Sequence, residues 1–121
     1  MQWEVEYTDE FETWWSTLSG LEQEAIARSV ELLARLGPAL ARPHADTIKG
    51  TRLANLKELR TQCVGQPYRM LFVFDPRRSA ILLIGGRKTG EARWYKKMIP
   101  LAEKLYAEHL AELRKAGLID G

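Results

Sequence analysis

The sequence predicts a small α+β domain in the order β-α-α-β-β-β-α, with an antiparallel sheet packed against an N-terminal helical hairpin and a C-terminal helix. Two observations predict this class. Apolar residues recur at helical spacing over residues 8–36 and 90–117, and three short apolar segments between residues 56 and 84 are separated by turn-forming residues. The 121 residues suffice for one modest hydrophobic core, so we expect residues 1–121 to form a single domain.

The N-terminal third predicts one strand and two helices. The segment "QWEVEY" alternates polar and apolar residues, as a short half-buried strand does. Thr8 is positioned to cap a helix whose acidic first turn suits the helix dipole. Ser19 and Glu22 have the spacing of a capping box for a second helix, which ends at Gly37 and Pro38. The two helices should form a hairpin.

The middle of the chain predicts three consecutive strands after a loop with a short strand or turn around Ile48. The strands are expected at Leu56–Cys63, Tyr68–Phe74 and Ala80–Ile84. Their connections, "VGQP" and "DPRR", are short enough for antiparallel hairpins. Because "RMLFVF" is apolar on both faces, the second of these strands should lie in the middle of the sheet.

The C-terminal segment predicts a helix that ends at Gly117 and that Pro100 either kinks or restarts. We expect the helices to pack on one face of the sheet. Cys63 is the one cysteine, which indicates a reducing, cytoplasmic setting. The N-terminus is acidic where a signal peptide is basic, and no apolar run approaches the roughly 18 residues of a membrane span, so we expect no membrane association.

Charge is distributed unevenly along the chain. Lys and Arg minus Asp and Glu gives −6 for residues 1–41, +9 for residues 42–97 and −1 for residues 98–121, within a net charge of +2. A basic segment between acidic ones is the expected footprint of a face that binds a polyanion. Solvated loop charges would give the same count.

The standard catalytic and cofactor motifs are absent from the sequence. It has no phosphate loop, dinucleotide fingerprint, metal-ligand spacing of His or Cys, or nucleophile elbow, so we expect no cofactor and no metal. His44 and His109 are expected to be structural or exposed, and Cys63 to be a small apolar residue.

The residues best suited to chemistry lie at strand ends. Strand alternation places Glu58 and Arg60 on one face, about 7 Å apart, and Arg69 opens the neighbouring strand. Arg87 and Lys88 follow the third strand in a "GGRK" turn. Such cations could bind a phosphate from several sides.

The aromatic pair that follows, Trp94 and Tyr95, could stack on a nucleobase. The bland alternatives are that Trp94 anchors the core and that a Glu–Arg pair on a strand is a surface salt bridge.

The succession of strand, helical hairpin, "LKELR", "PYRMLFVFD", "AILLIGGRKTG" and C-terminal helix resembles the RelE/ParE superfamily of toxin–antitoxin toxins, most closely its HigB-like branch, over roughly residues 3–110. This resemblance implies a RelE-like fold and a metal-independent endoribonuclease, an mRNA interferase that inhibits translation by cutting messages, commonly in the ribosomal A site. It also implies a cognate antitoxin, expected to carry a helix-turn-helix domain and to approach the basic face with acidic or apolar segments.

Carried over by position, the resemblance places Arg69 at the scissile phosphate and Arg60 as the basic residue of "ELR". Lys88, or Arg87 beside it, matches the basic residue after the third strand. Tyr95 is the nearest candidate for the C-terminal aromatic. The spacing to it is one residue longer than in the RelE pattern, which leaves Trp94 as an alternative.

The implied mechanism is attack of the RNA 2′-hydroxyl on the adjacent phosphate, with arginines stabilising the added charge. Glu58 stands where the RelE branch has a lysine and other branches use a glutamate as base. Tyr95 or Lys88 would protonate the leaving 5′-oxygen. The expected catalytic residues are Glu58, Arg60, Arg69, Lys88 and Tyr95, and the expected RNA-binding residues are Lys57, Arg77, Arg78, Arg87, Arg93 and Trp94.

Two alternatives remain open on the sequence. A ParE-like protein shares the fold but inhibits DNA gyrase by protein contact. A non-catalytic RNA- or DNA-binding module would use the same basic face and cut nothing. The basic residues around Glu58 favour the nuclease over the gyrase inhibitor.

Overall fold

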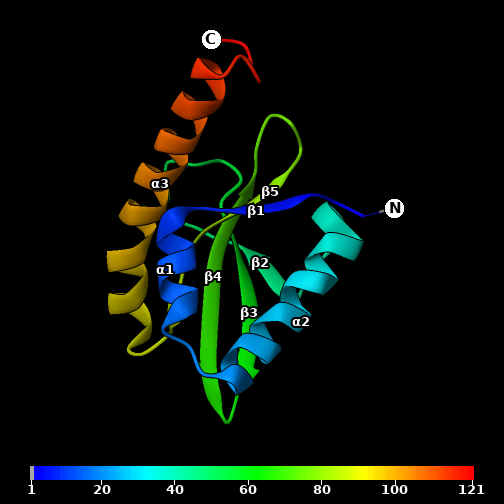
Figure 1. Cartoon of the computed structure of the whole chain (residues 1–121). Helices are drawn as coiled ribbons and strands as arrows, with labels where there is room; N and C mark the ends of the chain where they lie inside the picture. Colours follow the sequence, from blue (N-terminus) through cyan, green and yellow to red (C-terminus); the bar gives the residue numbers. More distant parts are fainter. Residues whose placement is uncertain (1) are drawn as a thin grey trace.

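The computed structural model describes residues 2–121, which form three main helices and one five-stranded sheet (Figure 1). The strands are β1 (Val5–Tyr7), β2 (Ala45–Thr47), β3 (Lys57–Cys63), β4 (Gln66–Phe74) and β5 (Ala80–Arg87). The helices are α1 (Asp9–Ser16), α2 (Gly20–Leu36) and α3 (Glu91–Lys115), with a short 3₁₀ turn η1 (Gly37–Ala39). The α+β class and the order of the predicted elements are confirmed. β2 adds a strand to that order and lies just before Ile48, where the sequence left a short strand or a turn open.

The sheet order is β1-β5-β4-β3-β2, so β4 is central as its two apolar faces predicted. One feature of the expected sheet is wrong: β1 pairs parallel with β5, so the sheet is mixed. The other pairings are antiparallel. The parallel pairing arises because α1 and α2 and three further strands intervene before the chain returns beside β1.

The helices cover both faces of the sheet, which corrects the expectation that they share one face. Figure 1 shows α2 and α3 on opposite sides of the strands. On one side, the helical hairpin packs on Leu59, Met70 and Phe72. On the other, α3 packs on Leu71 and Val73. Neighbouring residues of β4 therefore belong to different cores, because successive side chains of a strand point to opposite faces.

The predicted helix signals are present in the structure. The Thr8 hydroxyl accepts a hydrogen bond from the Phe11 N–H at 3.0 Å, and Ser19 and Glu22 form the reciprocal bonds of a capping box. At the other end of the chain, α3 continues through Pro100 without a break, and Gly117 adopts a φ of +73° just beyond the helix. That positive φ is readily adopted only by glycine and closes the helix.

A tight hairpin between β3 and β4 sets the position of the polar residues. Val64 and Gly65 both have positive φ, as a two-residue hairpin turn requires, and Cys63 pairs with Gln66. The same register places Arg60 opposite Arg69. Residues directly opposite one another share a face, so both arginines lie on the face covered by α3.

Close approach of Trp14 to Gly85 in β5 predicts a strict size limit at that position. A Cβ atom on Gly85 would lie 2.2 Å from the Trp14 ring. We expect Gly85→Ala to lower the free energy of unfolding by about 1–3 kcal/mol in urea denaturation, because the tryptophan must move. Gly20→Ala is the control, since its Cβ would meet nothing within 4 Å. Equal urea midpoints for the two variants would contradict this packing.

Candidate active site

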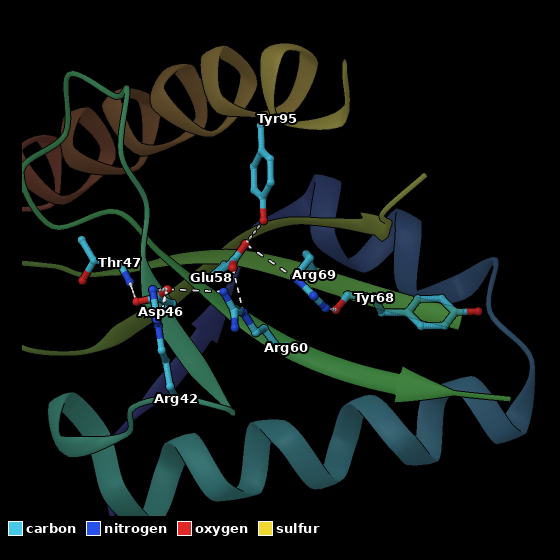
Figure 2. Close-up of polar contacts among 8 residues, drawn as sticks. All are labelled: Arg42, Asp46, Thr47, Glu58, Arg60, Tyr68, Arg69 and Tyr95. Carbon is cyan, nitrogen blue, oxygen red and sulfur yellow. Dashed lines mark hydrogen bonds and ion pairs between the residues drawn. The ribbon is translucent and has the colours of Figure 1, made fainter. Parts of the chain in front are cut away.

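A buried carboxylate, Glu58, is the centre of a polar cluster on the α3 face of the sheet (Figure 2). Glu58 is only 2% exposed. Arg60 Nε donates a hydrogen bond to its Oε2 at 2.8 Å, Arg69 Nε lies 3.9 Å from its Oε1, and the Tyr95 hydroxyl donates to the same Oε1. These three groups offset the large cost of removing a carboxylate from water.

The residues of this cluster come from two neighbouring strands and one helix. Glu58 and Arg60 are two residues apart on β3, and the β3–β4 register brings Arg69 alongside. Tyr95 lies in the second turn of α3, which packs over this face of the sheet, and its side chain extends down to Glu58. The structure therefore brings together four of the five residues predicted to be catalytic.

The fifth, Lys88, lies against Tyr95. Its Nζ is 5.4 Å from the centroid of the tyrosine ring. Burial first, and then the hydrogen bond to Glu58, raise the pKa of Tyr95 to about 12. The hydroxyl is therefore protonated at neutral pH and can donate a proton.

Asp46 and Arg42 also belong to the cluster, although the sequence did not predict them as site residues. Asp46 lies opposite Glu58 in the β2–β3 register, and its Oδ2 is 3.3 Å from Arg60 Nη2. Arg42 Nε donates to Asp46 at 2.8 Å, and this bond lowers the pKa of the Asp46 carboxyl. Arg60 is thus held between two carboxylates. The segment around Pro43 reads as a loop, so no pattern pointed to Asp46.

Arg69 keeps donor capacity for a ligand. Its Nη1 donates to the Tyr68 carbonyl at 3.0 Å, whereas its buried Nε has no hydrogen-bond acceptor among residues 2–121. A hollow of about 440 Å³ at the Glu58 cluster is lined by Asp46, Glu58, Arg60 and Tyr95 among other residues, whereas Arg69 lines a different hollow nearby. A phosphate oxygen is the type of acceptor that such a guanidinium binds.

Two of the predicted RNA-binding cations point to the other face of the sheet. Arg87 lies opposite Tyr68, whose ring packs in the core under the helical hairpin. Lys57 is one residue from Glu58 and so faces away from it, with its Nζ 6.0 Å from the centroid of the Phe74 ring. Neither belongs to the Glu58 cluster.

The cations of the β4–β5 turn are also separate from the cluster, because this turn lies at the opposite end of β4 from Arg69. Arg77 is paired with buried Asp75 and with Glu6. Arg78 lies over the Trp3 ring.

Trp94 is 8% exposed and packs in the core against Gly86, which corrects its expected role as a base-stacking surface. A buried ring offers no face to a nucleobase. Tyr95 is therefore the aromatic residue at the site. Arg93 is exposed on the first turn of α3.

The two histidines lie outside the Glu58 cluster. His109 is within 2.9 Å of the buried Asp75 carboxylate, a structural contact, and His44 is exposed. Among residues 2–121, no group of three or more His, Cys, Asp or Glu side chains is placed to hold a metal ion. In the same part of the chain, no helix has the length and apolar character needed to cross a membrane.

The fold is that of the RelE-like toxins. A structure of a mutant of the E. coli toxin RelE in the free state superposes with a TM-score of 0.58 at 8% identity, covering 78% of this chain and 92% of RelE. The archaeal RelE–RelB complex from Pyrococcus horikoshii gives a TM-score of 0.54 at 15% identity, covering 74% of this chain and 99% of the matched chain. At such identities the similarity establishes the architecture.

Sequence similarity narrows the class to a family. The family model for phage-derived Gp49-like proteins matches residues 13–107. Two candidate toxins of Mycobacterium tuberculosis are similar: HigB2 is 41% identical over 113 residues and HigB3 is 38% identical over 107 residues. These alignments cover 89% and 88% of this chain, 56% of HigB2 and 92% of HigB3, so the chain spans just over half the length of HigB2. The chain belongs to the Gp49-like family, and its fold is that of RelE.

The elevated pKa of Tyr95 gives a spectroscopic prediction. The difference in phenolate absorbance between the wild-type protein and Tyr95→Phe should titrate with a midpoint at about 12. Glu58→Gln should lower this midpoint, because it removes the negative charge while burial remains. The stability linked to Tyr95 is complete below its unfolded pKa of about 10 and is lost as the pH rises towards 12. A wild-type midpoint at about 10 would show that Tyr95 does not contact Glu58.

Proposed function

We propose that the protein is the toxin of a toxin–antitoxin module and acts as an endoribonuclease on messenger RNA. The observation that supports this most directly is the nearly buried Arg69 guanidinium, whose Nε lies 3.9 Å from Glu58 Oε1 without a hydrogen-bond acceptor among residues 2–121. Arg60 and Tyr95 contact the same carboxylate. An RNA phosphate bound between Arg60 and Arg69 would receive donors from both arginines. The Tyr95 hydroxyl, which donates a hydrogen bond to Glu58, supplies a proton donor at the same place.

The proposed reaction is attack of the 2′-hydroxyl on the neighbouring phosphorus. Glu58 takes the proton of the 2′-hydroxyl, a bond forms between the 2′-oxygen and phosphorus, and the bond to the 5′-oxygen breaks. Tyr95 gives its proton to the departing 5′-oxygen. The products are a 2′,3′-cyclic phosphate and a 5′-hydroxyl, and the direct hydrogen bond between Glu58 and Tyr95 returns the proton to the tyrosine.

Electrostatic stabilisation carries most of the proposed rate enhancement. Arg60 and Arg69 both form ion pairs with Glu58. The same two arginines stabilise the charge that develops on the phosphate, without a metal ion. The 5′ ends of the RNA products distinguish this reaction from metal-dependent hydrolysis. Attack by the 2′-hydroxyl leaves a 5′-hydroxyl, whereas hydrolysis by metal-activated water characteristically leaves a 5′-phosphate.

In the cytoplasm, the protein would have two kinds of partner, an antitoxin and its RNA substrate. A cognate antitoxin, with a helix-turn-helix domain, would neutralise the toxin, and the substrate would be a message engaged by the ribosome. The similarity to the RelE chain of a RelE–RelB complex supports an antitoxin partner. The ribosome and the antitoxin class are carried over from the resemblance to RelE and HigB toxins.

Arg69→Ala should abolish cleavage. In cells with controlled expression, wild-type protein should generate new 5′-hydroxyl ends in translated messages, and Arg69→Ala should reduce them by roughly a hundredfold or more, because the phosphate loses a preorganised cation. Arg35→Ala is the matched control, an exposed arginine of α2 that lies outside the Glu58 cluster. It should cleave as the wild type does.

The same experiment separates the competing functions. Growth arrest with intact messages would reject the nuclease and indicate a gyrase inhibitor, which DNA supercoiling assays would then test. Intact messages and normal growth would indicate a binding module. New ends carrying a 5′-phosphate would reject attack by the 2′-hydroxyl.

Glu58→Gln tests how much of the rate depends on a base. If charge and positioning dominate, single-turnover cleavage should persist, reduced by no more than about the 10²–10⁴-fold that general base catalysis contributes. Arg69→Ala measured in parallel gives the reference for loss of phosphate stabilisation. Complete inactivity of folded Glu58→Gln, verified by circular dichroism, would show that the carboxylate is indispensable.

A further inference from the structure

A second hollow, of about 560 Å³, lies where α2 passes the edge of the sheet and adjoins the Glu58 cluster. Arg60 and Arg69 line this hollow and also contact Glu58. Arg28 from α2 and His44, which precedes β2, complete its polar wall. Arg60 lines both hollows, so they meet at one of the two arginines assigned to the scissile phosphate.

The shape of this second hollow follows from the short length of β2. The Arg60 N–H donates to the His44 carbonyl at 2.8 Å, just before β2 begins at Ala45. Beyond that bond, β3 continues to Cys63, and no strand formed by residues 2–121 pairs with its outer side. The Ser29 hydroxyl lies 2.5 Å from the Thr61 hydroxyl and ties α2 to this open edge. This contact places the preceding residue, Arg28, at the mouth of the hollow.

The lining of this hollow is entirely basic, polar or apolar. It contains three arginines and His44, and none of its lining residues is acidic. Arg28 is exposed, and no hydrogen bond or ion pair to another residue in the range 2–121 holds its guanidinium. The hollow beside Tyr95, by contrast, includes Asp46 and Glu58. An anion bound in this hollow would thus meet no carboxylate among the residues that line it.

We propose that this hollow binds the nucleotide adjacent to the scissile phosphate on a single-stranded RNA substrate. Arg28 contacts the next phosphate of the strand, and the sugar and base lie against the wall formed by Ala25, Leu32 and Pro43. The polar side chain of Gln62 borders the same space. This inference rests on the proposed nuclease function and defines the course of the strand, which crosses the β3 edge towards α2.

The alternative course over the β4–β5 turn is disfavoured by charge. The turn's Arg77 is neutralised by Asp75 and Glu6, and Arg78 covers Trp3. A strand leaving Arg69 in that direction would also have to follow β4 from Arg69 to Phe74. The α2 side offers a cation directly beside Arg69 and Arg60.

Binding of a fully 2′-O-methylated RNA oligonucleotide tests this inference, since that probe cannot be cleaved through a 2′-hydroxyl. Arg28→Ala should weaken binding about tenfold at low salt. It should also reduce the slope of log affinity against log salt concentration by about 0.7, the value for one phosphate contact on a single strand. Arg35→Ala removes the same charge two turns further along α2 and should leave the affinity unchanged within twofold.

The outcomes separate this inference from the proposed function. If wild-type protein produces 5′-hydroxyl ends in cells while Arg28→Ala and Arg35→Ala bind the probe equally, the α2 subsite is rejected and the nuclease stands. If the wild type produces no such ends, the proposed function itself fails. Absence of probe binding by a wild type that cleaves messages would also reject the subsite. Arg28 is exposed, so thermal unfolding should show that its variant remains folded.

Discussion

The burial of Glu58 within a hydrophobic sheet is the constraint that organises the rest of the site. Moving a carboxylate out of water costs several kcal/mol even after the surroundings relax, and the cost is offset only by well-placed donors. Arg60 supplies one from the same strand, Arg69 an ion-pair partner from the next strand, and Tyr95 a hydroxyl from α3. The β3–β4 register and the docking of α3 must therefore both be correct before this carboxylate is satisfied. The contacts that fold the domain are therefore the same contacts that assemble the candidate active site.

Two tryptophans that pack on β5 link the hydrophobic cores to the position of the polar residues. The adjacent glycines of β5 face opposite sides of the sheet, where Gly85 admits Trp14 and Gly86 admits Trp94. Gly86 is also the register partner of Arg69. Trp94 therefore holds the first turns of α3 close to the arginine, and the neighbouring Tyr95 reaches the carboxylate. Large side chains in the cores thus restrict the positions of the polar groups, as precise catalysis requires.

Local sequence signals predicted most of the fold because their physical causes are local. The capping box of α2, the hairpin connections and the apolar faces of β4 all depend on a few neighbouring residues. The parallel pairing of β1 with β5 depends on residues about 75 positions apart, which no local pattern encodes. Coverage of both faces was, however, implied by "RMLFVF" itself, because a strand apolar on both sides needs a layer on each. Trp94 and Tyr95 could not be separated by residue type, and only the rotation of α3 decides which one faces the core.

The basic segment of the sequence is not the same as a basic surface in the fold. Residues 42–97 carry a net charge of +9, but Lys57 and Arg87 point to the opposite face and Arg77 is neutralised by two carboxylates. Conversely, Arg28 belongs to the segment with a net charge of −6 and yet lies beside the central arginines. Counting charge along the chain therefore includes cations that lie away from Arg69 and omits Arg28, which lies near it. What determines the attraction for an RNA strand is which cations lie near Arg69 without a carboxylate partner, and this depends on where α2 crosses the edge of β3.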